Sequence, residues 1–249
     1  MKALGKGFLT AIFWLAVWQC AHMAVDNSLL VPSPAQVAVK LAELAGERSF
    51  WLSSVMSLCR VVTGFLLGAA AGAVLAVLTG ISSAADALLR PLIAVIRATP
   101  VASFIILALV WLKSGHIPSF TAMLIVLPLV WANVTKGIAA MDRGLLEMTE
   151  AFGMRPWAKL TGLWAPMVRP YFDAAAVTGL GMAWKAGIAA EVIVSARDSI
   201  GAAISDSKVY LDIPGLFAWT LVVIALSMLL EKLLEAVTKR KGGAAGAEL

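Results

Sequence analysis

The segment Val55–Gly80, VMSLCRVVTGFLLGAAAGAVLAVLTG, decides the fold class of this chain. It runs for 26 residues with a single charged side chain, Arg60. A helix of about 20 apolar residues is long enough to cross the hydrocarbon core of a bilayer. Small residues recur at every fourth position, so they share one helix face and let a neighbouring helix come close. The segment is therefore predicted to be a membrane helix that packs tightly against another. These small residues are Gly64, Gly68, Gly72, Ala76 and Gly80.

Apolar segments of this kind occur along the whole chain. The 249 residues are 61% hydrophobic and 14% charged, with a mean hydropathy of +0.89. A soluble protein is about a quarter charged, so the excess of apolar residues requires a lipid environment. We predict an all-α, polytopic membrane protein with six transmembrane helices in a single domain, residues 1–249. The predicted spans are Gly7–Val25, Val55–Gly80, Leu92–Trp111, Phe120–Ile138, Ala174–Ser195 and Leu216–Ala236, and the fifth repeats the small-residue spacing at Gly179, Ala183 and Gly187.

The basic residues predict how the chain is oriented. Lys and Arg are enriched in cytoplasmic loops, and a cytoplasmic N-terminus places about twelve of them inside and about five outside. Both termini are therefore expected in the cytoplasm. This distribution accounts for the net charge of +5 without a nucleic-acid partner.

The scarcity of chemically active residues excludes several function classes. Two cysteines and two histidines are too few for a disulfide framework, a zinc site or a redox centre. The sequence contains no phosphate-binding Gly-x-x-x-x-Gly-Lys-Ser/Thr loop, so the chain is not predicted to be an ATPase itself. No catalytic residues, metal or cofactor are expected.

The loop at about residues 139–173 carries the clearest local signals. Asp142 can cap a helix that continues to Phe152, and Gly153 can end it in a left-handed conformation. Pro156 suits the first turn of a second short helix. We predict a cytoplasmic helix–turn–helix that Pro166 and Pro170 break again. Its apolar residues need a surface to bury against. They are Leu145, Met148, Phe152 and Trp157.

The same loop resembles that of the permease subunits of bacterial ABC importers, which has the form Glu-Ala-Ala, three residues, Gly, nine residues, Ile-x-Leu-Pro. Here Glu147-Met148-Thr149 is followed after three residues by Gly153, and after nine more by Leu163-Trp164-Ala165-Pro166. The resemblance implies a type I ABC importer permease (MetI-like) fold and docking of the loop in a groove of a cytoplasmic ATPase. The residues it assigns to this coupling are Glu147, Thr149, Ala151, Gly153, Leu163 and Pro166.

Further motifs are similar to those of the branch that imports nitrate, sulfonates, taurine and bicarbonate. They are Pro32-Ser33-Pro34-x-x-Val37, Ser57-Leu58-x-Arg60, Arg97-x-x-Pro100 and Ala190-Glu191. Ser199-Ile200-Gly201 departs from the usual Gly-Leu-Gly, and Trp111-Leu-Lys-Ser-Gly115 from the usual Trp-Phe-Gly. The solute therefore stays open, with a vitamin precursor as a further alternative.

The resemblance also implies the partners. They are a dimer of cytoplasmic ABC ATPases that binds the ATP, an extracytoplasmic solute-binding protein, and a second permease copy in the bacterial inner membrane. The polar segment Arg197–Asp212 is expected outside, where it either docks the binding protein or forms a plain solvated loop.

Three charged residues within the spans are candidates for the solute pathway: Arg97, Lys185 and Glu191. Ionisable groups in a membrane are costly and usually face protein or water. Lys185 and Glu191 lie about 120° apart on one helix, so they are poorly placed to pair with each other. For both, the alternative to a pathway role is a partner on another helix, and for Lys185 a further alternative is a side chain that extends to the membrane interface.

Two other function classes are alternatives to the importer. A self-contained secondary carrier is expected to have two repeated halves with broken helices, and no such repeat is found in the sequence. An integral membrane enzyme needs clustered His, Asp, Glu or Cys residues, which are scarce here.

Overall fold

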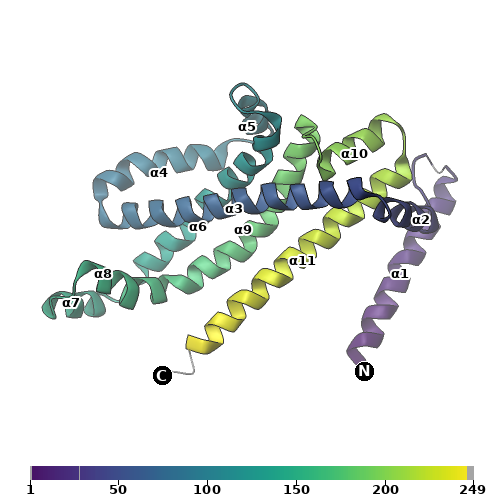
Figure 1. Ribbon diagram of the computed structural model, residues 1–249. Helices are drawn as coiled ribbons and strands as arrows, with labels where there is room; N and C mark the ends of the chain where they lie inside the picture. Colours follow the sequence, from purple (N-terminus) through teal and green to yellow (C-terminus); the bar gives the residue numbers. More distant parts are fainter. Residues whose placement is uncertain (1, 28, 246–249) are drawn as a thin grey trace.

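The computed structural model describes residues 2–27 and 29–245, and this part of the chain consists of helices joined by short turns and loops, without β-strands (Figure 1). The α-helices are α1 (Lys2–Val25), α2 (Pro34–Ala45), α3 (Arg48–Ile81), α4 (Ser83–Ala98), α5 (Val101–Ala108), α6 (Ile117–Ala139), α7 (Arg143–Ala151), α8 (Pro156–Lys159), α9 (Ala165–Val194), α10 (Ile200–Val209) and α11 (Ile213–Ala245). A 3₁₀ turn, Ser114–His116, precedes α6, and a π-helical turn, Leu160–Trp164, joins α8 to α9.

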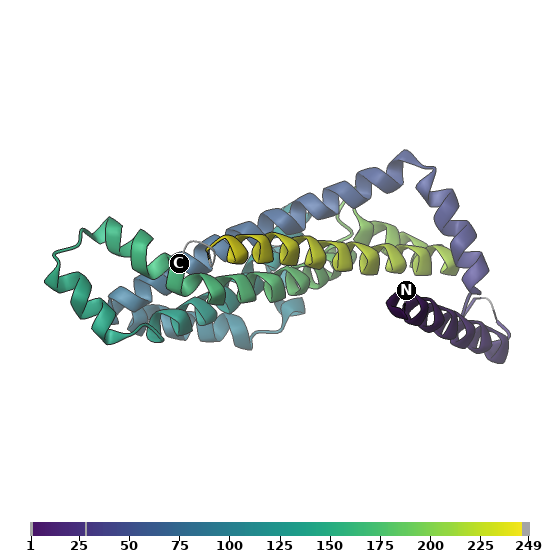
Figure 2. The same cartoon turned by 90° about the horizontal axis from the view of Figure 1, so that it is seen from below.

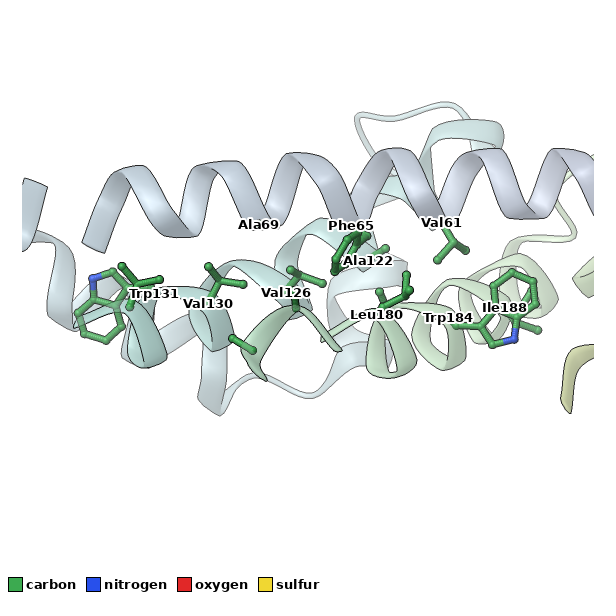
Figure 3. Close-up of a cluster of buried hydrophobic side chains, with 14 of the residues drawn as sticks. Val61, Phe65, Ala69, Ala122, Val126, Val130, Trp131, Leu180, Trp184 and Ile188 are labelled. Atoms are coloured by element: carbon green, nitrogen blue, oxygen red, sulfur yellow. The ribbon is translucent and has the colours of Figure 1, made fainter. Parts of the chain in front are cut away.

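Helices α3, α6 and α9 form the centre of the bundle. Their facing side chains make up the main apolar core, which Figure 3 shows between the three helices. Trp184 of α9 is fully buried in it and donates a hydrogen bond from Nε1 to the Val223 carbonyl of α11, at 3.0 Å. Helix α4 folds back along α3, and α11 lies against α9 (Figure 1).

The small-residue face of α3 packs directly on α6, as the four-residue spacing predicts. A Cβ atom at Gly64 would collide with the Ser119 carbonyl oxygen, and one at Gly68 would lie 2.6 Å from the Met123 carbonyl oxygen. The small face of α9 is used in the same way, since a Cβ at Gly187 would lie 2.5 Å from Val61 Cγ2 of α3. The two backbones can approach this closely only where no side chain stands between them.

The third predicted span is not a single helix, and that expectation is wrong. Helix α4 ends at Ala98, Thr99 is extended, and α5 starts after Pro100 at an angle of 100° to α4. Pro100 disfavours the helical conformation at Thr99, which explains why the helix stops there. The corner that results opens a space beside α6.

Within the described residues, four helical segments are long and apolar enough to cross a membrane, and a fifth crossing exists if α4 and α5 are counted together. Four of the six predicted spans fall within α1, α3, α6 and α11, and a fifth falls within α9 except for its last residue, Ser195, which caps that helix. The apolar stretch of α1, Leu9–Val25, is shorter than the others. Helix α1 stands apart from the bundle (Figures 1 and 2). Trp18 joins it to the rest of the chain by stacking on Phe217 of α11, with ring centroids 5.9 Å apart.

The expected breaks at Pro166 and Pro170 are also absent. Residues Trp157–Val194 form one continuous helical segment of 38 residues. In the π-helical turn, the Ala165 N–H donates to the Leu160 carbonyl, five residues back. Pro166 follows this turn in the first turn of α9, where the lack of an N–H is tolerated, so the chain continues as a helix.

The bundle has two contrasting ends. Helices α7 and α8 lie at one end, and α2 and α10 lie at the other (Figure 1). At the second end, Lys40 Nζ of α2 forms an ion pair with Asp212 Oδ2 at 2.9 Å. Asp212 also caps α11 by accepting a hydrogen bond from the Gly215 N–H.

Candidate functional site

The segment from α7 to α8 is a helix–turn–helix, as predicted. Asp142 Oδ1 accepts a hydrogen bond from the Gly144 N–H at 2.8 Å and so caps α7. Gly153 ends the helix with φ +58°, in the left-handed region that glycine adopts without strain. The Met154 N–H donates to the Thr149 carbonyl across this turn, at 3.0 Å.

The apolar side chains of this segment point away from the protein. Phe152 is 79% exposed and Trp157 is 73% exposed, and Met148 beside them is also exposed. By contrast, Thr149 is only 2% exposed. The turn thus offers two large aromatic surfaces with no cover from the described part of this chain.

The other predicted coupling residues lie along the same stretch. Glu147 and Ala151 are exposed on α7, and Leu163 is half-buried in the π-helical turn. Pro166 lines an apolar cavity of 580 Å³ formed by α3, α6 and the beginning of α9.

A polar cluster around Glu191 is buried between α3, α9 and the beginning of α10, apart from the α7–α8 segment. Glu191 is fully buried, and its Oε2 accepts hydrogen bonds from Ser57 Oγ at 2.7 Å and from the Gly201 N–H at 3.2 Å. Arg60 Nη1 lies 3.5 Å from Glu191 Oε1, and Arg60 Nη2 donates to the Arg197 carbonyl at 2.8 Å. Glu191 therefore has partners on other elements, which is the alternative to a pathway role that the sequence left open.

This cluster explains three of the sequence motifs at once. Ser57 and Arg60 come from one motif, Glu191 from another, and Gly201 from a third. A Cβ at Gly201 would collide with Glu191 Cβ, so glycine is required at that position. The sequence does not show that residues more than 130 positions apart meet here.

Arg97 lies at the corner between α4 and α5 and lines a cavity of 420 Å³. The opposite wall is one face of α6, where the lining residues recur every three or four positions from Thr121 to Lys136. Met182 of α9 closes a third side. Sequence reasoning missed Lys136 and Asn133 as lining residues, although their spacing from Thr121 and Leu129 on α6 could have indicated a shared face.

Lys185 is exposed on α9 and does not line this cavity. In the described part of the chain, its side chain has no hydrogen bond or ion pair. It lies in a row of exposed α9 residues spaced three or four apart: Ala174, Thr178, Met182, Lys185, Ala189 and Ile193.

These features match a known family of membrane proteins. Residues 64–242 match the family described as "Binding-protein-dependent transport system inner membrane component", which is well over half of the chain. The chain belongs to this family. Its members are permease components of ABC importers, so the protein is a transport subunit rather than an enzyme, and ATP is hydrolysed by a separate partner.

Individual relatives agree with this assignment. The chain is 23% identical to a putative aliphatic sulfonates transport permease of Bacillus subtilis, covering 94% of this chain and 86% of the relative. It is 26% identical to a riboflavin transport system permease of Chloroflexus aurantiacus, covering 91% and 87%. The fold resembles a chain of an amino acid ABC transporter crystallised with histidines, with a TM-score of 0.59 over 75% of this chain and 91% of that one at 17% identity.

Proposed function

We propose that this permease conducts a small anionic solute into a bacterial cell, with both termini in the cytoplasm. One relative is named for sulfonate transport and another for riboflavin, so the family alone does not choose the solute. Arg97 and Lys185 favour an anionic solute, because no carboxylate of the described residues pairs with either side chain. The whole chain, residues 1–249, acts as a single permease domain.

The ATPase docks on the α7–α8 segment. The observation that carries this assignment is the exposure of Phe152 and Trp157 on either side of the Gly153 turn. Aromatic residues that seat in a partner's pocket dominate the affinity of many interfaces. Glu147, Thr149, Ala151, Leu163 and Pro166 shape or flank this surface and act in coupling rather than chemistry.

A second copy of the permease covers the exposed row of α9. A lysine that faces lipid near the middle of a membrane costs about 3 kcal/mol on insertion scales. Lys185 avoids this cost if the row borders a water-filled pathway between two copies. The small residues of the row, such as Ala174 and Ala189, would allow a close approach there.

The solute-binding protein docks at the opposite end, around α10. Val209 at the end of α10 and Tyr210 and Leu211 in the turn that follows it are strongly exposed, and Tyr210 reaches 80%. An exposed apolar turn at the end away from α7 and α8 gives the binding protein a contact surface (Figure 1).

The decisive experiment is co-purification of the ATPase with a permease in which Phe152 and Trp157 are both replaced by serine. The matched control is Trp111→Ser, because Trp111 is 72% exposed but lies in the turn after α5. The double variant is expected to reach the membrane and lose the ATPase, whereas the control retains it. Normal ATPase binding by the double variant would refute the docking site.

A further inference from the structure

The cavity at the α4–α5 corner has a distinctive charge. Arg97 and Lys136 both line it, and no Asp or Glu is among its lining residues. Several other basic residues of the described chain are paired: Arg60 with Glu191, Arg90 with Asp86, and Arg169 with Asp173. For the Arg97 and Lys136 side chains, no hydrogen bond or ion pair is found within the described residues.

Arg97 and Lys136 are both exposed side chains. Two unpaired cations that line one cavity from opposite walls repel each other, and they are costly where they face a membrane. An anion between them removes both penalties, and an arginine guanidinium binds the oxygen atoms of an oxyanion well. The charge of the lining therefore selects an anionic ligand group.

The remainder of the lining is mostly apolar. Ile96, Val101, Phe104, Leu124, Ile125 and Leu129 contribute to it. The polar groups of Thr99, Thr121 and Asn133 each donate to a carbonyl of their own helix, at Val95, Ile117 and Leu129. Most of the cavity surface is thus suited to hydrocarbon rather than to a hydrated ion.

The cavity is also long enough to form part of a solute pathway. Its α6 wall extends from Thr121 to Lys136, which corresponds to about 22 Å of helix rise. Its volume of 420 Å³ lies within the range of about 300–1,000 Å³ that is typical of small-molecule sites.

From these observations we infer that the cavity is a binding site within the permease for a small organic oxyanion. The anionic head group binds Arg97 and Lys136, and a short apolar tail lies against Phe104, Leu124 and Leu129. The inference rests on the proposed function and deepens it, because it locates the solute within this chain and adds the requirement for an apolar tail.

The test uses position 182, where Met182 lines the cavity, as a reporter. Met182→Cys is introduced after Cys20 and Cys59 have been replaced by serine. The reporter thiol is then labelled in the full-length permease with two methanethiosulfonates of similar size, one bearing a sulfonate and the other a trimethylammonium group. The ratio of the two reaction rates reports the electrostatic potential in the cavity.

Replacing both Arg97 and Lys136 by methionine is expected to lower the anion-to-cation ratio by about tenfold or more. Arg90→Met is the matched control, because Arg90 lies on the same helix as Arg97 but outside the cavity, paired with Asp86. An alkanesulfonate is expected to protect the reporter thiol better than sulfate does, and only while Arg97 and Lys136 are present.

An equal drop of the ratio in the Arg90 variant, or no drop in the double variant, would overturn the site. Equal protection by sulfate and alkanesulfonate would overturn the apolar tail. Labelling needs neither the ATPase nor the binding protein, so it decides the site independently. Failure of the proposed function would instead be seen as uptake without ATP hydrolysis by a partner.

Discussion

At the scale of single residues, Gly153 is constrained by its backbone and not by its neighbours. Its φ is +58°, yet a Cβ at this position would have no atom within 4 Å. A substitution therefore acts through backbone strain, which is about 1–2 kcal/mol for an ordinary residue in this region and more for a β-branched one.

Gly153→Val is expected to shift the α7–α8 turn and abolish association with the ATPase while the helices still insert. Gly153→Asn is the matched control, since asparagine adopts the left-handed conformation readily. Both variants are compared by co-purification of the ATPase and by hydrolysis stimulated by the binding protein. If valine behaves like asparagine, the left-handed turn is not needed for coupling.

Glu191 is constrained in the opposite way, by contacts on every side. Glu191→Ala leaves Arg60 without its carboxylate and Ser57 without its acceptor, so it is expected to cost about 3 kcal/mol or more in stability. Asp86→Asn, which breaks the exposed pair with Arg90, is expected to cost less than about 1 kcal/mol. The measurement is thermal unfolding in detergent. Similar losses of stability in the two variants would contradict a stabilising role for the Glu191 cluster.

At the scale of helices, the contact between α3 and α6 depends on backbone approaching backbone. Gly68→Ala places a methyl group 2.6 Å from the Met123 carbonyl oxygen and is expected to lower stability by about 1–3 kcal/mol. Gly80→Ala places the same group 3.2 Å from a methyl of Ile138, a side chain that can move, and is expected to change stability by less than about 0.5 kcal/mol. Thermal unfolding followed by tryptophan fluorescence separates the two, and equal losses would mean that α3 can shift away from α6.

The helices themselves were predictable because apolar length and small-residue spacing are local signals. The bend at Thr99 and Pro100 was not, since a proline in an apolar run marks a break but not its angle. The helix break predicted at Pro166 was wrong, because the π-helical turn before this residue accommodates its missing N–H and the helix continues. In the candidate site, the Gly153 turn could be predicted from adjacent residues. The Glu191 cluster and the position of Lys136 in the cavity lining could not, because both result from packing between distant segments.

At the scale of the whole molecule, the proposed orientation places α7 and α8 in the cytoplasm and α10 outside. Cysteines introduced in place of Met154 and Tyr210, in a chain without Cys20 and Cys59, are expected to be labelled from opposite sides of the membrane. Tyr210 suits this test because its side chain is strongly exposed. Impermeant reagents added to intact cells should modify only the cysteine that replaces Tyr210, and modification of both would refute the topology.

The unbroken helical segment Trp157–Val194 has a mechanical consequence. It begins beside the Gly153 turn and reaches Glu191. One helical segment of about 57 Å therefore joins the proposed ATPase contact to the buried Glu191 cluster at the far end. A rotation of about 10° about its midpoint would displace each end by about 5 Å, and the contacts of α9 with α3 and α6 would have to shift with it. In the proposed orientation this segment thus has the geometry of a lever, in which a small tilt imposed at the ATPase contact also moves the end that carries Glu191.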